Sequence, residues 1–308
     1  MQSTLAQTST QQKEAGSHRS VAESLREYGR GIAGGLLFSL PLLYTMEMWQ
    51  AGITMHPLRL LAGVAATIVL LLGYNRYAGL REDAGWTEIA IDSIEELGLG
   101  FVLAAAILAM LGRITTSMPT NEVMGKIVVE AMTMAIGVSI GTAQLGASDD
   151  SSDGDDQGDS ADSSGDDEKD DDPPTFASQV VLGFCGAMLI ASNVAPTEEI
   201  IKLAVELRPW YVVGLAAVSL LLAALILFFS GFHAADRVSP QQGPVSIISG
   251  AMLNYAIALA ASAGALWFFD SLAGLGYTTG VAAIVVLGVA STLGASAGRL
   301  LIQAAAGK

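Results

Sequence analysis

Two segments of the chain place carboxylates close to a proline inside apolar sequence. The residues concerned are Pro41 and Glu47 in the first segment, and Asn193, Pro196, Glu198 and Glu199 in the second. Proline interrupts helical hydrogen bonding, and a charged carboxylate at mid-membrane costs about 2.5–3.5 kcal/mol on insertion scales. An interrupted helix beside such acids is typical of sites that handle cations or protons. The simpler alternatives are a Glu47 that snorkels to the surface and a second segment that merely starts a helix.

Other acids lie at the ends of apolar stretches or inside them. Asp92 and Glu96 are four residues apart, so they share a helix face, and they either mark the end of a helix or form a proton relay. Glu130 lies inside an apolar stretch with Lys126 four residues before it. We expect these two to form an ion pair that neutralises both charges, and the alternative is that Glu130 is a second transport acid.

Two strings match the G-x-S-x-G pattern of serine hydrolases, around Ser139 and Ser296. That chemistry needs a strand before the serine, a helix after it and a nearby base, whereas both strings lie inside apolar helical sequence. The glycines Gly137, Gly141, Gly294 and Gly298 are better explained by close helix packing, since small residues four apart let helix backbones approach. We expect no catalytic residues, no metal ligands, no cofactor and no enzymatic activity.

The amino-acid composition predicts the helices that position these residues. The chain has 308 residues, of which 52% are hydrophobic and only 15% charged. An ordinary soluble domain carries about a quarter charged residues. Eight apolar stretches approach the roughly 20 residues that cross a bilayer as a helix: 31–49, 60–77, 97–111, 123–145, 176–195, 210–232, 245–269 and 279–302. The prediction is an all-α, polytopic transmembrane bundle of about eight spans, in contact with the lipid bilayer.

The formal net charge of −15 is concentrated in one segment. Twelve Asp, one Glu and one Lys lie between positions 149 and 172, a local net charge of −12, which leaves −15 + 12 = −3 for the rest. A run this polar cannot bury enough surface to fold, so residues 148–174 are predicted to be a disordered acidic linker. Such acidity fits a halophilic protein, and the overall charge argues against nucleic-acid binding.

The linker separates two parts that resemble one another. Gly34 and Glu47 match Gly186 and Glu199 at an offset of 152, and the strings 137–141 and 294–298 match at an offset of 157. We therefore predict a tail (1–29), a first four-span half (30–147), the linker and a second four-span half (175–308). Halves with an even number of spans have the same orientation, so the repeat is parallel, with substrate sites expected between the halves.

Positive charges predict the orientation. With the N-terminus inside, ten of the fifteen Lys and Arg residues fall on the inner side. The positive-inside rule then places both termini and the linker in the cytoplasm, for a multi-pass protein of the plasma membrane.

The strings LPLLYTMEMW (40–49) and NVAPTEEI (193–200) resemble those of a family of integral membrane proteins of unknown function. The resemblance runs from about residue 26 to the C-terminus, with the linker as an addition. It implies a multi-span membrane protein and supplies no substrate, cofactor or catalytic residue.

The leading hypothesis is secondary transport or channel-like conduction of a cation or small solute, with protons as a possible coupling ion. Glu47 and Glu199 are the expected central carboxylates, assisted by Glu198, with Pro41, Asn193 and Pro196 opening the helices. Glu47→Gln and Glu199→Gln are then predicted to abolish flux. The alternative is a membrane scaffold or sensor subunit with structural acids and a linker that recruits a partner. The sequence leaves the oligomeric state open.

Overall fold

The computed structural model describes residues 21–79, 85–147, 176–234 and 244–306. Within these ranges the chain forms ten helices and no strand, which confirms the all-α prediction. The helices are α2 (Val21–Leu43), α3 (Met46–Thr54), α4 (Pro57–Ala78), α5 (Trp86–Met110), α6 (Thr120–Ala147), α7 (Phe176–Val194), α8 (Glu198–Glu206), α9 (Pro209–Ala234), α10 (Pro244–Phe268) and α11 (Tyr277–Ala306). The predicted acidic linker and most of the predicted tail lie outside the described residues.

Seven of the described helices are long and apolar enough to cross a membrane, namely α4, α5, α6, α7, α9, α10 and α11. The first of the eight predicted spans, 31–49, is not among them. The chain leaves the helix at Tyr44 and Thr45, so the apolar stretch is divided between α2 and α3. Residues 31–43 of α2 then extend only about 20 Å, less than the roughly 30 Å of hydrocarbon in a bilayer. The count of eight spans is therefore not confirmed.

Two helices have nine residues each, α3 and α8. A helix start near Pro196 was predicted, whereas α3 was not predicted as a separate element. Each follows an interruption of the preceding helix, and each begins after a threonine with extended backbone, Thr45 or Thr197. Each ends before a long helix whose first residue is a proline, Pro57 or Pro209. Proline suits the first helical turn because the amide hydrogen that it lacks would have no partner there.

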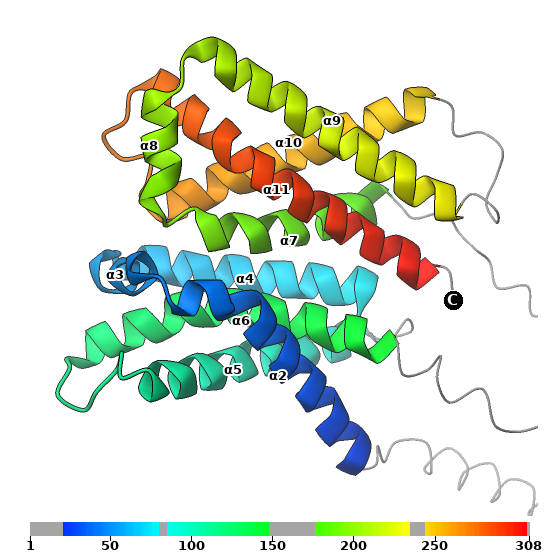
Figure 1. The fold of residues 1–308 in the computed structure, drawn as a ribbon. Coiled ribbons are helices and arrows are strands. Elements are labelled where there is room, and N and C mark those ends of the chain that lie inside the picture. Colours follow the sequence, from blue (N-terminus) through cyan, green and yellow to red (C-terminus); the bar gives the residue numbers. More distant parts are fainter. Residues whose placement is uncertain (1–20, 80–84, 148–175, 235–243, 307–308) are drawn as a thin grey trace, which may run out of the picture.

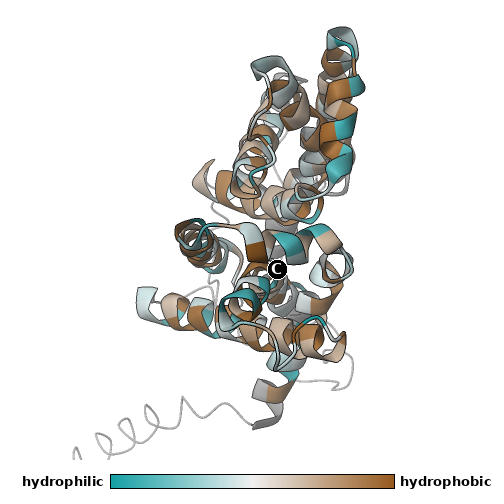
Figure 2. Ribbon diagram, turned by 90° about the vertical axis from the view of Figure 1, so that its left-hand side faces the viewer, coloured by the Kyte–Doolittle hydropathy of each residue, from teal (hydrophilic) through white to brown (hydrophobic). Residues whose placement is uncertain are grey.

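The ribbon shows two groups of helices, one above the other (Figure 1). We call α2–α6 the N-terminal half and α7–α11 the C-terminal half. The short helices α3 and α8 lie at one end of the molecule, and the end of α6, the start of α7 and the end of α11 lie at the other. The view along the helices also separates the two groups (Figure 2).

Helix α6 forms the core of the N-terminal half. In its membrane-length window 78% of residues are buried, compared with 11% in α9, which leaves α9 largely exposed on the outside of the C-terminal half. The halves meet through a cluster in which Tyr74 and Ile140 pack against Leu182 and Leu189 of α7. Near the α3 and α8 end, Arg59 also forms an ion pair with Asp270 at 2.7 Å.

The connections α5–α6 and α10–α11 begin in the same way. Gly112 and Asp270, each the second residue after the end of its helix, both have positive φ angles, 65° and 64°. The next residue in each case donates its backbone N–H back into the last helical turn, Arg113 to Leu108 and Ser271 to Leu266. This is the usual left-handed way of ending a helix, which glycine accepts readily and aspartate tolerates.

Candidate functional site

Only two charged side chains are buried among the described residues, Glu130 at 1% exposure and Lys126 at 6%, and both belong to α6. Most buried hydroxyl groups, such as those of Ser39 and Thr292, donate to a carbonyl one helical turn earlier. Such hydroxyls are satisfied within their own helix. The polar groups that remain for chemistry are therefore few.

Glu130 is the most unusual of them, since neither carboxyl oxygen has a hydrogen-bond partner. It follows the N-terminus of α6 by ten residues, or about 15 Å, which places it near the middle of a span. Met134 and Gly137, four and seven residues further on, belong to the same helical stripe, and this stripe packs against Gly35 and Phe38 of α2. Glu130 thus lies on the side of α6 that faces the α2–α3 region.

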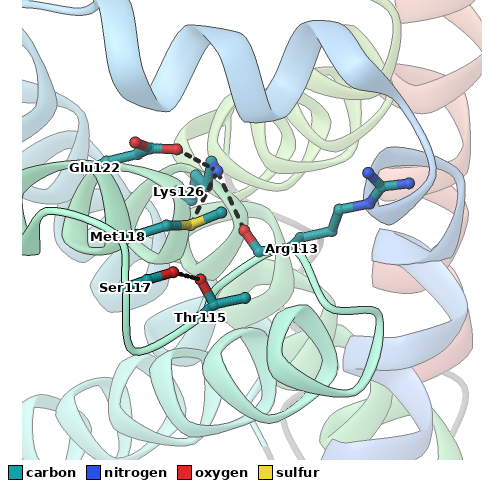
Figure 3. A network of polar contacts seen from close by, with 6 residues as sticks. All are labelled: Arg113, Thr115, Ser117, Met118, Glu122 and Lys126. Carbon is teal, nitrogen blue, oxygen red and sulfur yellow. Dashed lines mark hydrogen bonds and ion pairs between the residues drawn. The ribbon is translucent and has the colours of Figure 1, made fainter.

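The predicted Lys126–Glu130 ion pair is wrong. The Lys126 ammonium donates instead to the Glu122 carboxylate at 2.7 Å and to the Arg113 carbonyl at 3.1 Å (Figure 3). The Met118 sulfur lies 3.7 Å from the same nitrogen. All three ammonium hydrogens have acceptors, so Lys126 fastens the α5–α6 connection to α6.

The interrupted helices lie where the proline segments predicted them, with a difference in detail. Pro41 is inside the last turn of α2, and the helix ends only at Leu43. The second interruption falls between Val194 and Glu198, with Pro196 in the turn. Asn193 donates its side-chain N–H to the Leu189 carbonyl at 2.7 Å, while its side-chain oxygen is buried without a partner.

The acids of the two proline segments lie on the two short helices. Glu47 is half-buried on α3, and Glu198 and Glu199 are exposed on α8. Glu198 pairs with Lys202 at 2.9 Å. That hydrogen bond, followed by the charges of Glu198, Glu199 and Glu47, raises the pKa of Lys202 above its ordinary value. Carboxylates of the two halves therefore share one neighbourhood at the α3 and α8 end, around a lysine.

A polar network that was not predicted links three helices of the N-terminal half. Asn75 of α4 donates to the hydroxyl of Ser93 at 3.1 Å and to the carboxylate of Glu96 at 2.8 Å, both on α5. Ser139 of α6 donates to the Asn75 side-chain oxygen at 3.0 Å. Asn75, Ser93 and Ser139 are buried, while Glu96 is half-buried. An asparagine within an apolar helix is the sequence signal that could have suggested this network.

The C-terminal half buries polar groups that carry no charge. Asn254 of α10 donates to Ser296 of α11 at 2.9 Å, and Ser262 donates to Ser291 at 2.9 Å. The side-chain oxygen of Asn254 has no partner. Ser139 and Ser296, the central residues of the two matched glycine strings, thus both bond to an asparagine of a neighbouring helix.

The four glycines proposed for helix packing lie at helix crossings. A Cβ on Gly34 of α2 would collide with the backbone of Gly137 and Gly141. A Cβ on Gly186 of α7 would collide with the backbone of Gly294 and Gly298. Because backbones touch directly at both crossings, no larger residue fits without moving a helix.

A cavity of about 230 Å³ lies between the halves, where the two crossings come together. Gly34 and Gly141 line it from one half and Gly186 and Gly298 from the other, together with Tyr74. Neither Glu130 nor the carboxylates of α3 and α8 line this cavity. Glu47 and Glu199, the expected central carboxylates, therefore do not line this space between the halves.

Comparison with protein families identifies the chain. Residues 27–302 match DUF2391, a family of integral membrane proteins of unknown function. The chain belongs to this family. The match covers both halves and confirms the resemblance carried by the two proline and glutamate strings. Comparisons with curated proteins and with solved structures gave no match.

Proposed function

We propose that this family member is a secondary transporter or channel-like protein for a small cation, with protons as the first candidate and Glu130 as the central carboxyl group. The observation that carries the proposal is a carboxyl group at 1% exposure, inside a membrane-length helix, without any hydrogen-bond partner. Such a group is expensive to bury and is typical of ion and proton pathways.

The neighbouring helix interruption supports this role. Pro41 has no N–H, so the carbonyl of Leu37, four residues earlier, lacks its helical donor. Tyr44 and Thr45 lie outside any helix. Unpaired carbonyl groups are the means by which interrupted helices coordinate cations, and the Glu130 side of α6 faces this part of the chain.

The acids of α3 and α8 supply an entrance in this proposal. Glu47, Glu198 and Glu199 gather at one end of the molecule, where they raise the local concentration of cations. Because Glu199 is exposed, we expect Glu199→Gln to reduce flux rather than abolish it. With the positive-inside rule, this end faces outward, and the described ends of α6 and α11 face the cytoplasm across a plasma membrane.

Flux in lipid vesicles tests the proposal. The purified protein is reconstituted, and entry of protons is followed with a pH-sensitive dye under an imposed gradient. Glu130→Gln should reduce flux to that of empty vesicles. Glu88→Gln, which removes an exposed carboxylate at the start of α5, should leave it unchanged.

A second outcome would favour the alternative function. If the wild-type protein carries neither protons nor monovalent or divalent cations, and Glu130→Gln changes nothing, the transport proposal is wrong. Deletion of residues 149–172 would then test whether the acidic linker recruits a partner, as a scaffold or sensor subunit requires.

A further inference from the structure

We propose that Asn75, Ser93, Glu96 and Ser139 form a binding site for a monovalent cation, with Na⁺ as the probe. As a statement about the ion that is transported, this rests on the proposed function. As a statement about binding, it stands on the geometry of these four residues alone.

The first argument is the set of oxygen atoms around the Asn75 amide, whose N–H groups face Ser93 and Glu96 and whose oxygen faces Ser139. Side chains from α4, α5 and α6 bring a carboxylate, an amide oxygen and two hydroxyl groups into one chain of hydrogen bonds, none longer than 3.1 Å. The Ser139 hydroxyl also lies within hydrogen-bonding reach of the Glu96 carboxylate. Carboxylate, amide and hydroxyl oxygens are the ligands that hard cations prefer.

The second argument is the missing positive charge. Glu96 has no Lys, Arg or His partner in the described part of the chain. The charged groups that act on it are Asp92, on the same helix, and Glu27 of α2, both acidic, and the phenol of Tyr74 is the other titratable group nearby. A negative charge held inside a helical bundle without a basic partner calls for a cation or a proton.

The size of that charge favours a monovalent ion. The network contains one carboxylate, and its other ligands are neutral. Divalent cations such as Ca²⁺ are held by several carboxylates, and no group of three or more His, Cys, Asp or Glu side chains with metal-binding geometry occurs in the described ranges. Half-buried Asp92, one turn before Glu96, gives the ion a path from the end of the helix.

The position in the C-terminal half that corresponds to Glu96 carries no charge. Gly112 and Asp270, which end α5 and α10 alike, are 158 residues apart, and the same offset takes Glu96 to Asn254. Asn254 is neutral and bonds to Ser296, the counterpart of Ser139. The corresponding position therefore keeps its hydroxyl partner and needs no cation.

The site also has a geometrical relation to Glu130. Ser139 follows Glu130 by nine residues on α6, a rise of about 13 Å. Two acids at different depths of one half form two stations for a cation on its way across the membrane.

Binding is measured on the full-length protein in detergent, with radioactive Na⁺ and with the thermal unfolding midpoint. Chloride salts of Na⁺, K⁺ and choline are compared at equal ionic strength in alkaline buffer. We expect saturable Na⁺ binding and an unfolding midpoint that rises with Na⁺ more than with choline. Glu96→Gln should lose both effects, and Ser93→Ala should weaken the affinity by about tenfold. Ser296→Ala, at the matching position of the other half, should bind Na⁺ as the wild-type protein does.

Equal responses to Na⁺ and choline in the wild-type protein would overturn the site, and the charge would then be neutralised by a proton. Full Na⁺ binding by Glu96→Gln would overturn it as well. If Glu96→Gln does not fold, Ser93→Ala decides alone, since unchanged Na⁺ affinity in that variant contradicts the proposal. Binding without flux in vesicles would leave the site standing and refute transport. Flux that depends on Glu130, in a protein that binds no Na⁺, would refute the Na⁺ site and leave the transport proposal standing.

Discussion

In the N-terminal half α2 crosses α6 at Gly34, and in the C-terminal half α7 crosses α11 at Gly186, with glycine facing glycine in both places. Each half continues with an interruption, a nine-residue helix and three long helices. The buried interiors differ, however. The N-terminal half buries Glu130 and Lys126 and holds the Glu96 network, whereas the fully buried polar groups of the C-terminal half are neutral amides and hydroxyl groups, with Arg299 half-buried at the end of α11. This contrast shows that similar helix packing can surround charged side chains in one half and neutral ones in the other.

Two single substitutions, each giving one half the residue found at the matching position of the other, are the strongest test of this contrast. The offset of the matched glycine strings pairs Glu130 with Leu287, which is fully buried. Glu130→Leu should abolish flux and stabilise the fold by about 1–3 kcal/mol, because an unpartnered buried carboxyl group disappears. Leu287→Glu should destabilise it by about 2.5–3.5 kcal/mol. Vesicle flux and unfolding in detergent measure the two effects, and a Glu130→Leu variant with normal flux would remove the functional difference between the halves.

Substitution of glycine by alanine at the helix crossings should destabilise both halves to a similar extent. Gly34→Ala and Gly186→Ala each place a Cβ against the backbone of the opposite helix, so each should cost about 1–3 kcal/mol of unfolding free energy. Gly98→Ala and Gly264→Ala serve as controls, since a Cβ there meets nothing within 4 Å. These two should stabilise their helices by about 0.5–1 kcal/mol. A large difference between Gly34→Ala and Gly186→Ala would show that the crossings are not equivalent.

Substitution of the buried asparagine in each half should again change the unfolding free energy by different amounts, with a smaller difference. Asn75→Ala removes the partner of Ser139, Ser93 and Glu96, and we expect a loss of about 2–3 kcal/mol. Asn254→Ala breaks one bond to Ser296 and removes an oxygen that has no partner, so about 1 kcal/mol or less is expected. Denaturant unfolding of both variants gives the comparison, and equal losses would contradict it.

The smallest effect concerns the acids at the α3 and α8 end. Glu198→Gln should lower the pKa of Lys202 towards its ordinary value, since the hydrogen bond to Glu198 is the largest cause of the raised pKa. A raised lysine pKa stabilises the folded state below the ordinary lysine pKa, and this contribution is lost as the pH rises through the folded value. Because both side chains are exposed, unfolding at neutral pH should hardly change. NMR of labelled lysine measures the pKa, and an unchanged value would show that Glu198 and Lys202 do not pair in solution.

Hydropathy predicted most long helices to within a few residues, because the bilayer imposes length and polarity on every span. The separate helix α3 was missed, since its sequence continues an apolar stretch without a break in composition. The partner of Lys126 was misassigned for a different reason. Lys126 is four residues from both Glu122 and Glu130, so spacing allows either pair. A glutamate on the N-terminal side of the lysine gives the better geometry in a helix, and this favours Glu122.

Sequence alone determined the membrane class, most of the long apolar helices, the neighbourhoods of the two proline interruptions and the glycines that allow close packing, because each depends on local composition. The duplication of the chain is still a prediction, although both halves follow the same order of elements. Only the tertiary structure decided that Glu130 is left without a partner and that Asn75 joins Ser93, Glu96 and Ser139. Those bonds connect residues 18 to 64 positions apart in the chain, on three different helices. Contacts of this kind depend on how the helices rotate and cross, which no local pattern encodes.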